Sequence, residues 1–237
     1  MLKTILLVSL VLGALAVKGV DISQPFSTST FQCMKNNGVT FAIPRGYCSF
    51  GGYDTHAVSN LQNARGAGLT TDVYMFPCRG KSGTTQVNEL FTHVTPSLYS
   101  RVWIDVETNP SSGCSWTGHS AASNCDFVTE IAKAIAGHGK TAGVYASAYM
   151  WGQIMGGQKA CAGLSSHPLW YAHYDKNPSF SDFSPFGGWT KPFMKQYIGD
   201  TTLCGAGVDY NYHAWFLNKN NIIYQFIVIV SLNYIYY

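Results

Sequence analysis

The sequence predicts an α/β protein whose fold is a modified TIM-like barrel, with five β/α units followed by three strands. Two observations support this fold class. Short apolar runs typical of strands alternate with segments of helical period through most of the chain, and three further strand-like runs then follow without full helices. Strands joined by right-handed helical crossovers favour closure into a single barrel. We therefore expect one domain.

The first five units follow one another in order. The predicted strands are residues 20–22, 39–43, 72–76, 102–106 and 142–146, and the helical segments after them are residues 27–38, 54–65, 87–94, 127–137 and 149–155. In the second helix, for example, Ala57, Leu61 and Ala64 recur on one face, and Gly66 ends the helical pattern. The last helix is short, and the regular alternation ends with it.

Three strands are predicted after that point, at residues 169–174, 194–198 and 207–210. The segment 175–192 between the first two is rich in Pro, Gly, Ser and Phe and has no helical period. We expect the barrel to close here without the usual helices.

The two ends of the chain differ from the barrel. Residues 1–19 have the layout of a signal peptide, because one Lys precedes a short apolar run and then small residues. We assign residues 20–217 to the barrel and residues 218–237 to an atypical apolar tail. Our hypothesis is that this tail is not part of the evolved domain; the alternative is a genuine β-rich or anchoring extension. The leader predicts a secreted protein or one delivered to a lysosomal or phagosomal lumen.

Charge and motif content exclude several function classes. The formal net charge is +3 without a concentrated basic stripe, so no nucleic-acid partner is expected. A cationic amphipathic segment is missing, so no stable membrane insertion is expected, and we expect a monomer. The chain has no CxxC spacing and no HExxH, so neither a metal nor a cofactor is predicted.

Seven cysteines in an oxidising compartment should mostly form disulfides. Cys114 and Cys125 bracket a loop rich in Gly and Ser and are the easiest pair to assign, and Cys161 with Cys204 is a plausible second pair. The remaining three cannot all pair among themselves, so one thiol is left over: Cys33, Cys48 or Cys78.

The candidate catalytic residues are acids at strand ends. Asp105 and Glu107 project to the same side, because side chains two apart on a strand share a face. Two carboxylates this close disfavour each other's ionisation, so one should hold its proton toward neutral pH, as a general acid requires. Asp21 and Asp209 end the first and last strands, which are neighbours in a closed barrel. Four acids on one rim indicate a glycosidase. The alternative is a structural pair neutralised by Arg45 or Arg101.

Aromatic residues at strand ends could present flat faces to sugar rings. Tyr74 and Tyr145 are expected beside the strand tops, while Trp170 and Tyr171 follow in "LWYAHYD". Core packing is the alternative for each of them. His173 in the same motif could orient a carboxylate or be a core histidine.

The motifs "GVDIS", "FAIPRGY", "DVYMFPC", "WIDVE", "GVYASAYMW", "LWYAHYD", "KQYIGD" and "GVDYN" together resemble family 25 of the glycoside hydrolases, the N-acetylmuramidase type of lysozyme, in its animal and protist branch. The resemblance runs from residue 19 to about residue 215. It implies hydrolysis of the β-1,4 bond between N-acetylmuramic acid and N-acetylglucosamine in bacterial peptidoglycan. The cysteine-bracketed loop and the tail depart from the family pattern.

The resemblance also implies roles for individual residues. Glu107 would be the general acid, and Asp105 would position the 2-acetamido group of the substrate for retention without an enzyme nucleophile, or else a water would attack directly. Asp21 and Asp209 would complete the acidic site. Besides these, the substrate-binding candidates are Tyr74, Tyr145, Trp170, Tyr171, Gln196 and Arg45.

Two other functions remain as alternatives. A family 18 chitinase has the motif DxxDxDxE, but here Ser100 and Trp103 replace two of its acids. A catalytically inactive barrel that binds peptidoglycan or chitin is the alternative from a different class, although Glu107 is present.

Overall fold

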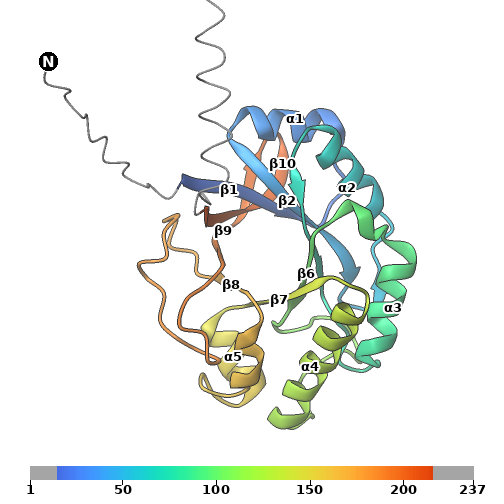
Figure 1. Ribbon diagram of the computed structural model, residues 1–237, viewed down its shortest axis with the longest axis vertical. Helices are drawn as coiled ribbons and strands as arrows, with labels where there is room; N and C mark the ends of the chain where they lie inside the picture. Colours follow the sequence, from blue (N-terminus) through green and yellow to red (C-terminus); the bar gives the residue numbers. More distant parts are fainter. Residues whose placement is uncertain (1–14, 216–237) are drawn as a thin grey trace, which may run out of the picture.

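The computed structural model describes residues 15–215 and shows a closed barrel flanked by helices (Figure 1). Its ring consists of β1 (Leu15–Ile22), β2 (Val39–Cys48), β5 (Val73–Met75), β6 (Arg101–Asp105), β7 (Thr141–Ala146), β8 (Leu169–Ala172), β9 (Met194–Leu203) and β10 (Ala206–Trp215). The ring closes because β1 pairs with β2 on one side and with β10 on the other. Two short strands, β3 (Gly52–Tyr53) and β4 (Thr70–Thr71), pair with β2 outside the ring.

All strands of the ring except β10 run in the same direction, so their carboxyl ends meet at one mouth of the barrel. β10 is antiparallel to both of its neighbours, and Asp209 lies near its beginning rather than at its end. The strand predicted from the sequence, residues 207–210, is shorter than β10 and has Asp209 near its end. Because β10 returns through a tight turn from β9, its beginning reaches the same mouth, and Asp209 is paired with Asp21 in the register.

Five helices cover the outside of the barrel along the first crossovers (Figure 1). They are α1 (Thr28–Asn36), α2 (Ala57–Gly66), α3 (Gly83–His93), α4 (Ala121–Gly137) and α5 (Ala148–Met155), with short 3-10 turns at Pro96–Leu98 and Ala162–Ser166. α4 illustrates their packing, because Phe127, Ile131 and Ile135 recur on its buried face. Beside β8 and β9 an aromatic loop with Phe180, Phe183 and others takes the place of helices. The fold class predicted from the sequence is confirmed.

The interior of the barrel is filled by a separate aromatic cluster. Phe41, Ile43, Trp103, Trp170 and Met194 point inward from their strands and pack together. A side chain at position 143 on β7 would collide with the Trp103 ring, so that position is glycine. The filled interior means that a ligand can approach the acids only from the mouth.

The disulfide pairs differ from those predicted. The structure joins Cys33 to Cys204, Cys78 to Cys114 and Cys125 to Cys161, and it leaves Cys48 as a buried free thiol. Both assigned pairs, Cys114–Cys125 and Cys161–Cys204, were therefore wrong. Their assignment assumed that cysteines near each other in sequence pair. In the barrel the loops after β5 and β6 are neighbours, which brings Cys114 to Cys78 instead.

The predicted ends are only partly within the described residues. β1 begins at Leu15 and therefore overlaps the predicted signal segment 1–19. The tail 218–237 lies outside the described residues. Among residues 15–215, no helix has the length and apolar character needed to cross a membrane.

Candidate active site

The four acids named from the sequence gather at the mouth of the barrel. Asp21 stands near the end of β1 and Asp105 ends β6, while Glu107 follows two residues later and Asp209 faces Asp21 from β10. Asp21 and Asp105 lie at the carboxyl ends of their strands, Glu107 lies in the loop after β6, and Asp209 lies in the first half of β10. From these positions the four side chains reach the opening without disturbing the apolar barrel interior.

Gln196 on β9 connects the acids of β1 and β10. Its Nε2 donates to Asp21 Oδ1 at 2.9 Å and to Asp209 Oδ2 at 3.1 Å. Its Oε1 in turn accepts hydrogen bonds from the hydroxyls of Tyr145, at 2.6 Å, and Tyr174, at 2.8 Å. The amide of Gln196 therefore fixes the two carboxylates relative to two tyrosines of the mouth.

Asn211 is a site residue that the sequence analysis missed. Its Nδ2 donates to Asp21 Oδ1 at 2.6 Å, and its Oδ1 accepts from the indole of Trp170 at 2.8 Å. Asn211 lies two residues after Asp209 on the same strand, so the alternation of side chains was the signal that would have found it.

The pair formed by Asp105 and Glu107 retains protons above the usual pH range of carboxyl groups. Burial is the main cause that raises the pKa of Asp105 well above its ordinary value, and the nearby charges of Glu107 and Asp21 raise it further. Burial also raises the pKa of Glu107, and Asp209 adds to this, while a hydrogen bond with Asp105 acts in the opposite direction. Burial is the largest cause of both shifts, and Asp105 is the more deeply buried of the two.

The remaining two acids have the same character. Burial raises the pKa of Asp21 well above its ordinary value, and the charge of Asp209 adds to the effect, although Asn211 and Gln196 oppose it with hydrogen bonds. Burial raises the pKa of Asp209, whose carboxylate accepts the backbone N–H of Asp200 at 2.6 Å. The mouth is thus a set of mutually interacting carboxyl groups.

Neither arginine suggested as a structural partner neutralises this set. Arg45 forms an ion pair with Asp54 at 2.8 Å and also donates to the Ser23 carbonyl at 3.2 Å. Arg101 forms an ion pair with Asp72 at 3.0 Å. Among the described residues Asp105 Oδ1 is buried without a hydrogen-bond partner. The alternative of an arginine-neutralised structural pair is therefore not supported.

Glu107 opens onto a cavity of about 300 Å³ at the mouth. The cavity is also lined by Tyr145, Ser147, Met150, Ala172, His173 and Tyr174. Tyr74, on β5, is close to the same acids. Burial raises the pKa of its hydroxyl well above the ordinary value, and the charge of the nearby Asp21 raises it further. The expected position of Tyr74 and Tyr145 beside the strand tops is where the structure has them.

Trp170 and Tyr171 are not placed where a substrate would touch them. Trp170 is only 2% exposed and packs inside the barrel, so it acts on the site through Asn211. Tyr171 points to the outside of the barrel, where its hydroxyl donates to Asp182 at 2.9 Å. The expectation of direct substrate contact is corrected for both, because alternation along β8 sends one ring inward and the other outward.

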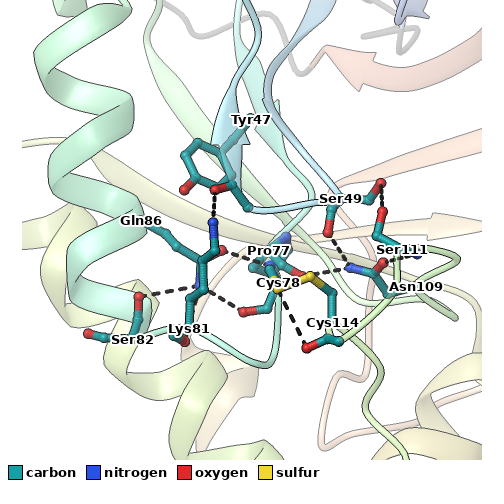
Figure 2. Close-up of a disulfide and its surroundings, with 12 residues drawn as sticks. Tyr47, Ser49, Pro77, Cys78, Lys81, Ser82, Gln86, Asn109, Ser111 and Cys114 are labelled. Carbon is teal, nitrogen blue, oxygen red and sulfur yellow. Dashed lines mark hydrogen bonds between the residues drawn. A yellow bond between two sulfur atoms is a disulfide. The ribbon is translucent and has the colours of Figure 1, made fainter.

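The backbone that carries Glu107 is held by its own loop. The indole N–H of Trp116 donates to the Glu107 carbonyl at 2.8 Å. Figure 2 shows how the same loop is anchored further along: the amide of Asn109 donates to the carbonyls of Ser49 and Pro77 at 2.9 and 3.1 Å, and Cys114 is bonded to Cys78. The acid therefore extends from a braced loop.

His173 belongs to a charged cluster at the edge of the cavity. Its Nδ1 lies 2.6 Å from Asp182, and the three side chains of His173, Asp175 and Asp182 have a spacing suited to a metal. The ammonium of the fully buried Lys195, however, lies 2.7 Å from both aspartates and already provides their positive partner. The cluster is an ion-pair network that orients His173.

Comparison with known proteins identifies the family of this chain. Residues 14–197 match the family model described as Lysozyme-like protein 1. A protein of Dictyostelium discoideum named probable GH family 25 lysozyme 2 is 42% identical over 202 residues, which cover 84% of this chain and 91% of that protein. Lysozyme-like protein 5 of Caenorhabditis elegans is 39% identical over 216 residues, which cover 88% of this chain and 96% of that protein.

Solved structures share the fold at lower sequence identity. A family GH25 lysozyme from Aspergillus fumigatus has a TM-score of 0.72 at 22% identity, covering 87% of this chain and 98% of that one. A muramidase from Trichobolus zukalii has a TM-score of 0.70 at 22% identity, covering 86% and 97% of the two chains. At this identity the likeness establishes the fold.

Proposed function

Because the chain belongs to family 25 of the glycoside hydrolases, a family of lysozymes, we propose that it cleaves the glycan of bacterial peptidoglycan. The bond attacked is the β-1,4 linkage between N-acetylmuramic acid and N-acetylglucosamine. The observation that carries the proposal is the group of four interacting carboxyls at the barrel mouth, beside an open cavity.

Glu107 is the general acid in this proposal. It lines the cavity and its pKa is raised by burial, so it can carry a proton at a pH where exposed glutamates are ionised. Protonation of the glycosidic oxygen by Glu107 would allow the leaving sugar to depart as an alcohol. Of the four acids, Glu107 is the one that lines the cavity.

Asp105 would receive the acetamido group of the substrate. Its partnerless Oδ1 is an acceptor that an amide N–H of the substrate would satisfy. Such a hydrogen bond favours the ionised form of Asp105, so the proton of the coupled pair would shift to Glu107 when the substrate binds. Binding would thus prepare the acid and hold the acetamido oxygen for attack on the anomeric carbon, with retention. Direct attack by water is the other course that this arrangement permits.

Asp21 and Asp209 share the amide of Gln196, and whichever of the two is ionised would supply negative charge opposite the developing oxocarbenium ion. Gln196 and Asn211 hold them in position, so their contribution requires no rearrangement during the reaction. We also propose secretion or delivery to a lumen, since three disulfides suit an oxidising compartment.

The proposal is tested with purified protein and peptidoglycan. We expect new reducing ends that are N-acetylmuramic acid; N-acetylglucosamine ends would assign the enzyme to the other bond.

Glu107→Gln should lower kcat by about 10²–10⁴-fold while binding to peptidoglycan persists. The matched control is Glu130→Gln, which removes a carboxylate from α4, outside the barrel mouth. This variant should retain activity. Undiminished turnover in Glu107→Gln would show that Glu107 is not the general acid. If the unaltered chain binds peptidoglycan without turnover, it is an inactive carbohydrate-binding barrel.

A further inference from the structure

A second cavity lies beside the one that contains Glu107. It measures about 460 Å³ and is formed by the loop after β6 together with α4 and α5. Thr108, the residue after Glu107, lines this second cavity, and Met150 lines both. The Thr108 hydroxyl lies 3.4 Å from the sulfur of Met150, the residue that lines both spaces. A ligand long enough to pass this contact would occupy both cavities.

Each cavity presents an exposed aromatic ring. Tyr174 borders the cavity at Glu107 and is 56% exposed, and Tyr149 borders the second cavity and is 67% exposed. A tyrosine ring left this accessible contributes little to packing. On a rigid wall it offers a flat face of the kind on which a sugar ring stacks.

The walls of the second cavity are fixed before any ligand binds. Asn124 on α4 donates to the carbonyl of Ile154 on α5 at 3.0 Å, which ties the two helices together. Asn109 is anchored to two neighbouring loops, and Cys114 is held by its disulfide to Cys78 (Figure 2). A preformed cavity of this kind loses little conformational entropy on binding.

The chemistry of the lining favours a neutral ligand. Among the described residues that line the second cavity there is no Asp, Glu, Lys or Arg. The polar groups are hydroxyls and amides such as those of Thr108, Thr117 and Gln153, which hydrogen-bond to sugar hydroxyl and acetamido groups. The stem peptide of peptidoglycan carries carboxylates and amines, and for these the lining offers His119 but no Asp, Glu, Lys or Arg.

We propose that the second cavity binds an additional neutral sugar residue of the same glycan strand, with Tyr149 as its stacking platform. This inference rests on the proposed function. It makes Tyr149 a residue that determines preference for strand length, and it gives the loop after β6 a second task besides carrying Glu107. The chain would bind extended strands more tightly than short ones.

The test measures binding by titration calorimetry in the Glu107→Gln background, so that no turnover is needed. The probes are peptide-free glycan strands, a long one and the shortest that binds, together with a long strand that carries its stem peptides. We expect Tyr149→Ala to weaken binding of the long strand about three- to tenfold and to leave the shortest unchanged. Tyr149→Phe keeps the ring and should bind like the parent.

Phe50 provides a matched control, because it is 61% exposed and lines neither cavity. Phe50→Ala should bind both strands normally. Equal loss for the two lengths, the same loss in Phe50→Ala, or no loss in Tyr149→Ala would overturn the proposal. A loss seen only with peptide-bearing strands would also overturn it and assign the cavity to the peptide. Absence of hydrolysis by the unaltered chain would instead count against the proposed function alone.

Discussion

At the scale of single residues, the acids of the mouth impose a cost on the folded state. The raised pKa of Asp105 means that the folded chain holds a proton that the unfolded chain has already released. Between the pKa of the unfolded chain and the raised pKa of the folded chain, stability therefore falls as the pH rises. At neutral pH the negative charge on the buried carboxyl groups of the mouth lowers the stability of the folded chain the most. This cost is usual for a site built from like charges.

Asp105→Asn should stabilise the protein at neutral pH, because it removes one of these groups. We expect a gain of about 1–2 kcal/mol, or roughly 2–8 °C in Tm, that disappears as the pH is lowered toward 4 (about the ordinary pKa of an unfolded Asp). Thermal unfolding from acid to neutral pH measures this.

Glu130→Gln gives the opposite sign and serves as the control. Burial alone would raise the pKa of Glu130, but the N–H of Thr84, 2.7 Å away, reverses this and lowers it. Its contribution to stability is present above the unfolded pKa and lost as the pH falls. A loss of Tm at neutral pH is therefore expected. Identical signs for the two variants would contradict the electrostatic account.

Trp116 is a positioning residue, since it contacts the carbonyl of Glu107 and not the reacting atoms. Trp116→Phe keeps an aromatic ring against Phe127 but removes the N–H donor. We expect kcat on short strands to fall about two- to tenfold, from the loss of one hydrogen bond, with little change in KM.

The variant Trp189→Phe tests whether the loss of kcat in Trp116→Phe comes from the position of Glu107 or from a general loss of stability. The buried Trp189 donates in the same way to the His167 carbonyl at 2.7 Å, beside a different cavity. This variant should lose similar stability and keep its kcat. If both variants lowered kcat alike, Trp116 would have only a structural role.

At the scale of elements, the disulfides brace the loops and helices around the ring. Cys125 on α4 is bonded to Cys161 after α5, and Cys33 on α1 is bonded to Cys204 in the turn between β9 and β10. These links hold the less helical side of the barrel against the helical side.

Peptide mapping without reduction should recover these pairs and the bond between Cys78 and Cys114. Cys48 is buried, and burial is the main cause that raises the pKa of its thiol, so it should resist alkylation in the native state. We expect one reactive thiol per chain, seen only after denaturation. After cleavage of the chain at Trp116, between the two cysteines, a disulfide that joins Cys114 to Cys125 would contradict the structure.

At the scale of the whole molecule, closure of the ring creates the site. Gln196 and Asp21 are separated by 175 residues in the chain and lie 2.9 Å apart across the mouth. No local segment holds more than two of the four acids. The carboxyls interact only because β1 lies between β2 and β10.

The sequence by itself determined the order of strands and helices, the eight-strand count and the four acids, because these depend on local periodicity and on the residues at strand ends. It also determined the placement of Tyr74 and Tyr145 through simple alternation. Those features need no knowledge of which strands are neighbours.

Only the tertiary structure decided the disulfide pairs, the inward packing of Trp170, the roles of Asn211 and Trp116, and the direction of β10. Each of these depends on contacts between segments far apart in the chain. The physical reason is that side-chain periodicity fixes which face a residue occupies, whereas the partner on that face is set by how the barrel closes.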